Sequence, residues 1–310
     1  MKILFVITKS EIGGAQVFVL NLARALKKNG CNVEVAAGDG DYLFGELQKD
    51  SITFHYLNSL KRNFSIINSF YFIYDLHRLL KKNKYDVVHL NSTNTLVGAI
   101  STSFLKEKPK TVFTFHGLSF IDKNYRANFF FKMLAKFYYK LLLNTLDRVV
   151  LECNLNYKEV KEAGMVKNAE VIYNGLDEKE MSFLSGKDAR IYFSEKCGID
   201  LTDNFLIGST GRLIYQKNYD FLIHNYLRIK EKIPNAKVVI VGDGPDRENY
   251  EGLIQKFGIQ NDFFMIGELK NSHQYMKGFD VFTLSSRYEG VSISLIEALY
   301  AEIPILASNV

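Results

Sequence analysis

The first thirty residues, MKILFVITKSEIGGAQVFVLNLARALKKNG (1–30), combine an apolar strand, a glycine turn and an amphipathic helix. The run ILFVI is rich in β-branched residues, which is typical of a strand covered on both faces. After the glycines, apolar residues recur at three- and four-residue spacing, and Lys27, Lys28 and Gly30 are signals that end a helix. No cleavage-site pattern follows the apolar run, so we interpret it as the first buried strand and not as a signal peptide.

The same alternation of short apolar runs and amphipathic stretches recurs along the chain. Strands are predicted at 3–7, 33–37, 52–57, 87–90, 111–115, 148–152, 205–210, 236–242, 262–267, 279–284 and 304–308. Alternation of this kind predicts parallel sheets with helices on both faces. The polar stretch 171–200 has no strong period and is interpreted as a domain junction. The sequence therefore predicts an α/β protein with two tandem Rossmann-like, doubly wound domains, 1–172 and 173–310.

Composition and cysteine usage agree with a soluble two-domain chain. The 310 residues exceed the usual size of one domain, and 47% of them are hydrophobic. No window of about 18 uninterrupted apolar residues predicts a membrane-spanning helix. Cys31, Cys153 and Cys197 are odd in number and far apart, which fits a reducing cytosol and provides neither a zinc site nor a disulfide framework.

Charge is distributed unevenly between the two predicted domains. Residues 1–172 contain 24 Lys and Arg against 15 Asp and Glu, a net of +9, whereas residues 173–310 contain 15 against 19, a net of −4. The basic first half suggests an anionic partner such as a membrane surface, a phosphorylated lipid or nucleic acid. Within the apolar stretch 128–148, lysines recur every fourth residue. This stretch is either an interfacial membrane helix or a buried helix with one solvated face.

Two loops that follow predicted strands are candidate phosphate sites. Gly13 and Gly14 lie between the first strand and the first helix, where backbone N–H groups can approach an anion, although an ordinary tight turn has the same pattern. Because GxGxxG is absent, a nicotinamide oxidoreductase is disfavoured. Arg212 and Lys217, in GRLIYQK (211–217), precede a helix. The dipole at a helix N-terminus disfavours positive side chains. Their presence here therefore favours a role in binding a diphosphate over a role as two solvated surface charges.

Two further motifs follow strands at 111–115 and 236–242. His116 lies at the carboxyl end of its strand, where it can donate a hydrogen bond to a sugar or stabilise developing charge, or serve only a structural role. The glycines and proline of VGDGPDR (241–247) predict a sharp turn. We interpret that turn as structural.

The stretch EGVSISLIE (289–297) contains two carboxylates eight positions apart. Gly290 and Val291 lie at the expected helix start, where free backbone N–H groups suit a phosphate. Eight residues along a helix span roughly 12 Å, too far for an acid/base pair acting on one bond, since retaining glycosidase carboxylates lie about 5 Å apart. That span fits a sugar, a diphosphate and a ribose. We therefore expect Glu289 to accept from sugar hydroxyls and Glu297 from a ribose.

Taken in order, these motifs resemble the family 4 glycosyltransferases, the retaining GT-B enzymes with an E-x7-E motif. The resemblance extends over nearly the whole chain: the GG loop, HG after a strand, VIYNG at the junction, GRLxxxK, GDGP, and E-x7-E followed by IPILAS. It implies two Rossmann-like domains with a cleft between them. The first domain would take the acceptor, and the second would hold a nucleotide-diphosphate sugar.

The resemblance also implies roles for the candidate residues. Arg212 and Lys217 would bind the donor diphosphate together with backbone at Gly13, Gly14, Gly290 and Val291. Glu297 would bind the ribose, and His116 and Glu289 are the candidate catalytic residues beside the reacting sugar. Such enzymes need no metal and no cofactor beyond the sugar nucleotide, because Arg and Lys neutralise the diphosphate. The anomeric configuration would be retained, with the departing phosphate taking the acceptor proton.

Two departures from the family pattern carry expectations of their own. In YAEIP (300–304), Glu302 takes the place of a helix-ending glycine, which costs roughly 1 kcal/mol if the position requires the left-handed conformation. The family continues beyond SNV (308–310) with further helices. We therefore expect a truncated second domain, lower stability than a chain with a family-like tail, and less efficient turnover.

The leading hypothesis is a cytoplasmic glycosyltransferase that contacts the inner face of the cell membrane peripherally. It would transfer a sugar to a glycan or lipid-linked acceptor in bacterial surface polysaccharide synthesis, with no nucleic acid partner. One alternative is a non-catalytic sugar-nucleotide-binding protein. Another is a sugar-nucleotide epimerase of the same shape, which ranks lower because 173–310 contains only His224 and His273 as candidate acid/base histidines.

Overall fold

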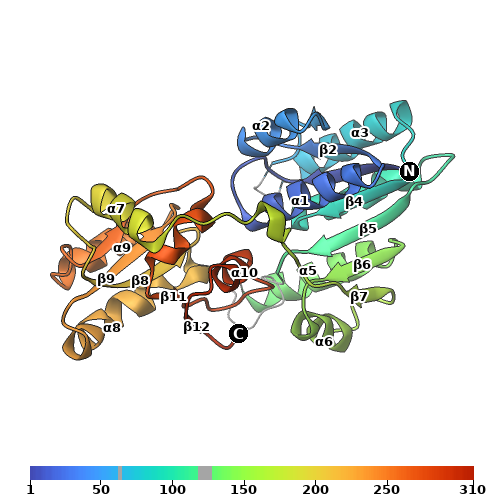
Figure 1. The fold of residues 1–310 in the computed structure, drawn as a ribbon. Coiled ribbons are helices and arrows are strands. Elements are labelled where there is room, and N and C mark those ends of the chain that lie inside the picture. Colours follow the sequence, from blue (N-terminus) through green and yellow to red (C-terminus); the bar gives the residue numbers. More distant parts are fainter. Residues whose placement is uncertain (62–64, 118–127) are drawn as a thin grey trace. The chain divides into compact units, whose positions relative to one another are not determined.

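The computed structural model describes residues 1–61, 65–117 and 128–310, and they form two compact units (Figure 1). Unit 1 is Met1–Asn174 and unit 2 is Gly175–Val310. The division falls two residues beyond the predicted boundary between 172 and 173. Each unit contains one parallel β-sheet with helices connecting its strands, so the predicted α/β class with two tandem parallel-sheet domains is confirmed.

The sheet of unit 1 has the strand order β3-β2-β1-β4-β5-β6-β7. Its strands are β1 (Lys2–Ile7), β2 (Asn32–Ala37), β3 (Thr53–Tyr56), β4 (Val87–Asn91), β5 (Lys110–Phe115), β6 (Arg148–Leu151) and β7 (Ala169–Val171). The connections are α1 (Gly14–Lys28), α2 (Tyr42–Lys49), α3 (Ile66–Lys82), η1 (Thr93–Gly98), α4 (Ala99–Ser103), α5 (Phe129–Leu143) and α6 (Asn154–Glu162). The order reverses between β1 and β4, and ligands bind at such switch points in doubly wound folds.

The two faces of this sheet have separate cores. Alternate residues of β1 point to opposite faces: Phe5 and Ile7 pack with residues of α1 and α2, whereas Leu4 and Val6 pack with residues of α3, α5 and α6. Right-handed crossovers account for this division. The direction in which strands are added to the sheet reverses after β3, so the helices before and after that point lie on opposite faces. The continuous apolar run at the start of the chain is therefore the central strand of a sheet covered on both sides.

The smaller sheet of unit 2 has the order β10-β9-β8-β11-β12. Its strands are β8 (Phe205–Thr210), β9 (Ala236–Val241), β10 (Phe263–Met265), β11 (Val281–Leu284) and β12 (Ile305–Ala307). The helical elements are η2 (Glu178–Glu180), α7 (Gly186–Cys197), η3 (Tyr215–Lys217), α8 (Tyr219–Lys232), α9 (Arg247–Lys256), η4 (Ser272–Gly278) and α10 (Ile293–Tyr300). Here the switch point lies between β8 and β11.

Helix α7 lies within stretch 171–200, in which the sequence showed no strong period and which was interpreted as a domain junction. The Ser185 hydroxyl accepts from the Asp188 N–H at the start of the helix, and Gly198 ends it in the left-handed conformation. Phe193 is fully buried and stacks on Phe279, with ring centroids 4.9 Å apart. Few residues of α7 are buried, so its polar composition hid the helical period.

The chain leaves α10 through Glu302, whose φ of +58° is left-handed. Glutamate in place of a helix-ending glycine was expected to cost stability if position 302 is left-handed, and it is. A side chain in that conformation costs about 1 kcal/mol. The next residues return to the sheet as β12, which pairs in parallel with β11.

Candidate functional site

The switch point of unit 2 brings together the loops that follow β8 and β11. The two strands are hydrogen-bonded neighbours, so their carboxyl ends lie side by side. Asn218 adopts a left-handed φ of 56° after η3, and its side-chain amide donates to the Ser285 carbonyl at 3.0 Å. In return the Ser285 hydroxyl donates to the carbonyls of Lys217 and Asn218. These bonds lock the two predicted site loops to each other.

Within these loops the structure joins Lys217 to Glu289. The Lys217 Nζ lies 2.6 Å from Glu289 Oε1, and the two side chains are only 14% and 13% exposed. Ser286 Oγ also donates to Glu289 Oε1 at 2.6 Å, and Gln216 Nε2 lies 3.3 Å from Oε2. Two residues predicted from separate motifs therefore form one partly buried ion pair.

Arg212 lies partly buried in the same β8 loop, whose backbone is held by the turn after β9. Leu213 donates its N–H to the Asp243 carbonyl at 3.0 Å and accepts from the Asp246 N–H at 3.0 Å. A Cβ on Gly244 would lie 2.4 Å from the Leu213 carbonyl oxygen. The GDGP turn thus has the structural role predicted for it, because its glycines let it pack directly against the loop that carries Arg212.

The start of α10 differs from the prediction. The helix begins at Ile293 behind the N-cap Ser292, whose side chain makes no capping bond, so Gly290 and Val291 lie in the preceding loop. The spacing from Glu289 to Glu297 is therefore only partly helical. The helical length estimated from the sequence applies only to the portion that begins at Ile293.

Glu297 lies inside α10 and faces a histidine of η4. Its Oε1 is 3.9 Å from His273 Nδ1, and burial raises the pKa of Glu297 to about 7. Burial also lowers the pKa of His273 below its ordinary value, and the Nε2 atom of that ring is buried without a hydrogen-bond partner among the described residues. The sequence offered His273 only as a candidate acid/base histidine of the lower-ranked epimerase, because nothing in its own segment reveals that it faces Glu297.

In unit 1, His116 follows β5 and belongs to a buried polar network. Its Nδ1 lies 2.6 Å from Glu152 Oε1, and Asn174 Nδ2 donates to the same oxygen at 2.7 Å. Its Nε2 lies 3.2 Å from Asn91 Oδ1. Asn91, His116 and Glu152 end or follow three neighbouring strands, β4, β5 and β6. Asn91 and Glu152 were not among the residues predicted from the sequence, although polar residues at successive strand ends were a usable signal.

Both ring nitrogens of His116 face acceptor oxygens. The Asn91 amide nitrogen donates to the His89 carbonyl, which leaves Oδ1 for the histidine ring. A ring nitrogen that carries a proton can donate to either of these oxygens. Burial, with a smaller contribution from the charge of His116, lowers the pKa of neighbouring His89 to about 3. To form a hydrogen bond with a substrate through Nε2, His116 would first have to lose its contact with Asn91.

The glycine loop lies at the start of α1, close to this network. Gly13 is the N-cap of α1 in an extended conformation with no side-chain cap, and Gly14 is the first helical residue. A Cβ on Gly13 would meet only the flexible end of Gln16, so steric crowding alone does not require glycine there. Phe18 of α1 packs edge-on against His116, with centroids 4.8 Å apart.

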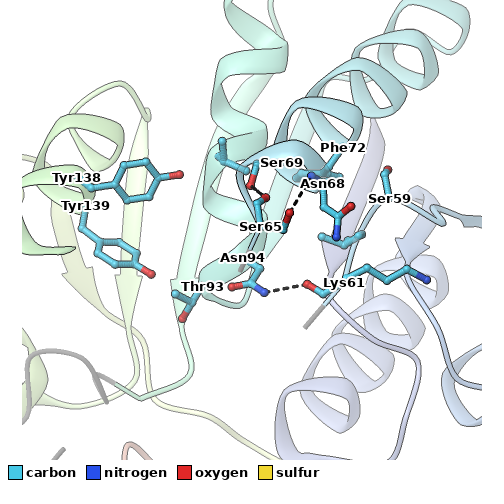
Figure 2. A pocket seen from close by; sticks show the side chains of 12 residues that line it. Ser59, Lys61, Ser65, Asn68, Ser69, Phe72, Thr93, Asn94, Tyr138 and Tyr139 are labelled. Carbon is cyan, nitrogen blue, oxygen red and sulfur yellow. Dashed lines mark hydrogen bonds between the residues drawn. The ribbon is translucent and has the colours of Figure 1, made fainter. Parts of the chain in front are cut away.

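Unit 1 also contains a hollow that the sequence did not predict (Figure 2). It has a volume of about 410 Å³, including space open to solvent, and lies between the N-terminal part of α3, the start of η1 and α5. Figure 2 shows Tyr138 and Tyr139 opposite Ser65, the N-cap of α3, and opposite Asn68 and Ser69 of that helix. Lys61 points away from the tyrosines, and its Nζ pairs with Asp39 at 2.8 Å. The lining that faces the hollow is therefore mainly hydroxyl, amide and aromatic.

The described residues contain neither a cluster of metal ligands nor a membrane-spanning helix. No group of three or more His, Cys, Asp or Glu side chains in 1–61, 65–117 and 128–310 could hold a metal ion. No helix in the described part of the chain is long and apolar enough to cross a bilayer.

Family comparisons match both units. The model described as Glycosyltransferase Family 4 matches residues 12–180, more than half of the chain, and the model described as Glycosyl transferases group 1 matches residues 194–310. The chain belongs to glycosyltransferase family 4. The first match contains Gly13, Gly14 and His116, and the second contains the loops of Lys217 and Glu289, so this glycosyltransferase has its candidate residues inside the matched regions.

Two of the similar proteins are glycosyltransferases of Escherichia coli. The UDP-Gal:α-D-GlcNAc-diphosphoundecaprenol α-1,3-galactosyltransferase of Escherichia coli is 29% identical over 84% of this glycosyltransferase and 67% of its own length. The E. coli O-antigen biosynthesis glycosyltransferase WbnH is 26% identical over 99% of this chain and 80% of its own length. This chain spans about two thirds of the length of several curated relatives.

Solved structures share the fold of this family 4 glycosyltransferase. Anabaena Alr3699/HepE, crystallised in complex with UDP and glucose, superposes with a TM-score of 0.82 and 20% identity. The match covers 100% of this chain and 81% of HepE. At this level of identity the likeness establishes the architecture alone.

Proposed function

We propose that this chain transfers a sugar from a nucleotide-diphosphate donor to a glycan or lipid-linked acceptor, with retention of the anomeric configuration. The observation that carries the proposal is the Lys217–Glu289 pair at the switch point of unit 2, in the same loop system as Arg212. A fixed cation beside a fixed carboxylate matches a ligand whose phosphate and sugar hydroxyls are adjacent. The names of the relatives support a role in bacterial surface polysaccharide synthesis.

The donor would bind along the loops after β8 and β11. Arg212 and Lys217 would contact the diphosphate, which competes with Glu289 for the lysine ammonium. Glu289 would then accept from hydroxyls of the transferred sugar. Backbone N–H groups at Gly290 and Val291, ahead of the uncapped start of α10, would contribute further donors. In unit 1, Gly13 and Gly14 would offer similar donors at the uncapped start of α1.

Glu297 would hold the ribose of the donor. With a pKa raised to about 7, its carboxyl is present in both protonation states near neutral pH. The protonated form donates to one ribose hydroxyl while accepting from the other. This makes the residue a binding group, and it adds no nucleophile.

The reaction needs only the groups already named. The bond between the anomeric carbon and the diphosphate oxygen breaks, and an acceptor hydroxyl oxygen bonds to the same face of that carbon. The departing phosphate oxygen takes the proton of that hydroxyl, so the diphosphate leaves with the charge that Arg212 and Lys217 stabilise. His116, whose Nδ1 lies 2.6 Å from Glu152 Oε1, would act as a hydrogen-bonding group beside the sugar. No metal or further cofactor takes part in this proposal.

The hollow of unit 1 would receive the acceptor. Hydroxyl and amide groups bond sugar hydroxyls, and tyrosine rings pack against the apolar face of a sugar. Because Lys61 is paired with Asp39, the lining favours an uncharged sugar ring over a phosphate. A cytoplasmic location at the inner face of the membrane follows from a lipid-linked acceptor.

A thermal-shift screen with UDP-, GDP- and ADP-sugars tests the proposal. One nucleotide class should raise the melting temperature of the unmodified chain, and Arg212→Ala should lose most of that increase. Product analysis with an added acceptor then separates transfer from binding alone, since a non-catalytic binder would be stabilised without moving sugar. Equal melting temperatures with and without every donor would contradict the proposed donor site.

A further inference from the structure

Two helices of unit 1 expose large apolar side chains to solvent. Helices α3 and α5 both pack against the same face of the sheet, because residues from each belong to one core cluster with Leu4 and Val6 of β1. Their outward sides therefore belong to one layer of unit 1. Large apolar side chains gathered on a surface mark a binding face in soluble proteins.

Helix α3 contributes the longer stripe. Its buried face is Phe72, Leu76 and Leu80, so the sheet is already satisfied by one side of the helix. On its other side, five large side chains are each 59–69% exposed: Ile66, Ile67, Phe70, Tyr71 and Tyr74. They recur at i, i+1, i+4, i+5 and i+8, the spacing of one helical face. Over its first half, helix α3 therefore has an apolar side that is exposed to solvent.

Helix α5 repeats the arrangement. Tyr139, Leu142 and Leu143 are buried against the core. Four side chains on the outward face are 49–67% exposed: Met133, Leu134, Phe137 and Leu141. Lys136 and Lys140 are exposed on the same face. The sequence left open an interfacial helix or a buried helix with one wet face, and the exposed face is both apolar and cationic.

The charges along both stripes have one sign. Helix α3 continues from its apolar half into Arg78, Lys81 and Lys82, and Arg78 lies over the Tyr74 ring at 5.7 Å. The sequence of α5 contains three lysines and no acidic residue. In α3 the only acidic residue is Asp75, which accepts a hydrogen bond from Ser59 at 2.6 Å. Apolar side chains beside cations are the composition of a helix that lies in an anionic lipid surface.

We propose that the exposed faces of α3 and α5 together form a docking surface for an anionic lipid bilayer. The apolar side chains enter the boundary between headgroups and acyl chains, and the lysines and arginine contact the phosphates. A second copy of this chain fits the same face poorly, because a symmetric contact would set cations against cations. The charge pattern therefore favours lipid over self-association.

The role of this docking surface rests on the proposed function, because it would bring the acceptor site to the membrane. The hollow of unit 1 is lined by the N-cap Ser65 and by Asn68 and Ser69 from α3, and by Tyr138 and Tyr139 from α5. The proposed acceptor site therefore opens between the two helices that would contact the bilayer. A sugar attached to a membrane lipid would reach the hollow at headgroup level without leaving the membrane.

Vesicle co-sedimentation tests the surface independently of sugar transfer. The probes are phosphatidylcholine vesicles with and without phosphatidylglycerol, and the variants are Phe70→Ser and Leu134→Ser. Phe221→Ser is the matched control, because Phe221 is 59% exposed on α8 of unit 2. The unmodified chain and the control should bind vesicles that contain phosphatidylglycerol. Each of the other two variants should partition roughly tenfold more weakly, since one inserted side chain is lost.

Three results would overturn the proposal. These are no binding of the unmodified chain to phosphatidylglycerol vesicles at low salt, equal binding of all three variants, and a concentration-dependent dimer that Phe70→Ser dissociates. Melting temperatures of the variants, measured with and without the stabilising sugar nucleotide, show that each is folded. They also keep this test separate from the donor site: loss of lipid binding with an unchanged nucleotide response concerns the docking surface alone.

Discussion

At the residue scale, the proposed donor site is organised around one carboxylate. One carboxylate oxygen of Glu289 accepts hydrogen bonds from Lys217 and Ser286, and the other accepts one from Gln216. These contacts fix the orientation of Glu289 before any ligand binds. Fixed polar groups lose little freedom on binding and act without reorganisation. When a diphosphate sugar binds, Lys217 would exchange its contact with Glu289 for a contact with the diphosphate. Glu289 would then remain in position to bind the sugar.

Glu297 predicts a pH-dependent stability. Its folded-state pKa of about 7 lies above the ordinary value of 4.5, so between these pH values the folded chain binds more protons than the unfolded chain. The stability contributed by this group is present below about pH 4.5 and is lost as pH rises through about 7, by on the order of 3 kcal/mol. Glu297→Gln should remove this loss, raising the melting temperature at pH 8 and changing it little at pH 5.

Circular dichroism melts at the two pH values check this prediction, with Glu248→Gln as the control because that carboxylate is exposed on α9. A Glu297→Gln variant that melts no higher than the unmodified chain at pH 8 would show that the carboxyl is not held in a costly environment.

Residues inside local motifs were predictable, and residues joined only by the fold were not. Lys217 and Glu289 stand in recognisable loops, so the sequence assigned both to the donor site, although it did not predict their mutual ion pair. Glu152 and His273 have no motif of their own. Their partners, His116 and Glu297, are 36 and 24 positions away in the sequence, and the contacts exist only because parallel strands and η4 bring them together.

At the element scale, the loop after β8 depends on the turn after β9. Backbone hydrogen bonds join Leu213 to Asp243 and Asp246, and Gly244 lies against the Leu213 backbone. The sequence predicted the turn from its glycines and proline. It missed α7 and placed the start of α10 too early, because a short helix with few buried residues has a weak period and a serine N-cap is not unique in sequence.

Gly244→Ala should disturb the donor loop through the backbone alone. The new methyl group would stand 2.4 Å from the Leu213 carbonyl oxygen, so the loop must shift at a cost of about 1–3 kcal/mol. We expect a lower melting temperature and weaker stabilisation by the sugar nucleotide.

Gly252→Ala in α9 is the matched control for this change, since nothing lies within 4 Å of its added Cβ and alanine favours a helix by up to about 1 kcal/mol. Calorimetric melts of both variants, with and without nucleotide, make the comparison. An unchanged nucleotide response in Gly244→Ala would separate the β9 turn from the donor site.

At the scale of the whole molecule, each unit places its candidate residues at the carboxyl edge of a doubly wound sheet. Fold class followed from the strand-and-helix alternation, because strands buried on both faces are continuous apolar runs. Strand order, the short edge strand β7 and the hollow between α3 and α5 could not be predicted, since they depend on how distant segments pack. The division into units falls within the polar stretch that the sequence marked as the junction.

The central claim is that the switch point of unit 2 binds a nucleotide diphosphate through Lys217. Isothermal titration of the stabilising nucleotide into the unmodified chain, Lys217→Ala and the exposed-lysine control Lys256→Ala measures this directly, with melting temperatures to establish that each protein is folded. We predict roughly ten- to hundredfold weaker binding for Lys217→Ala, as expected for the loss of a charge-assisted contact, and no change for Lys256→Ala. A folded Lys217→Ala variant that binds the nucleotide as tightly as the unmodified chain would contradict the account.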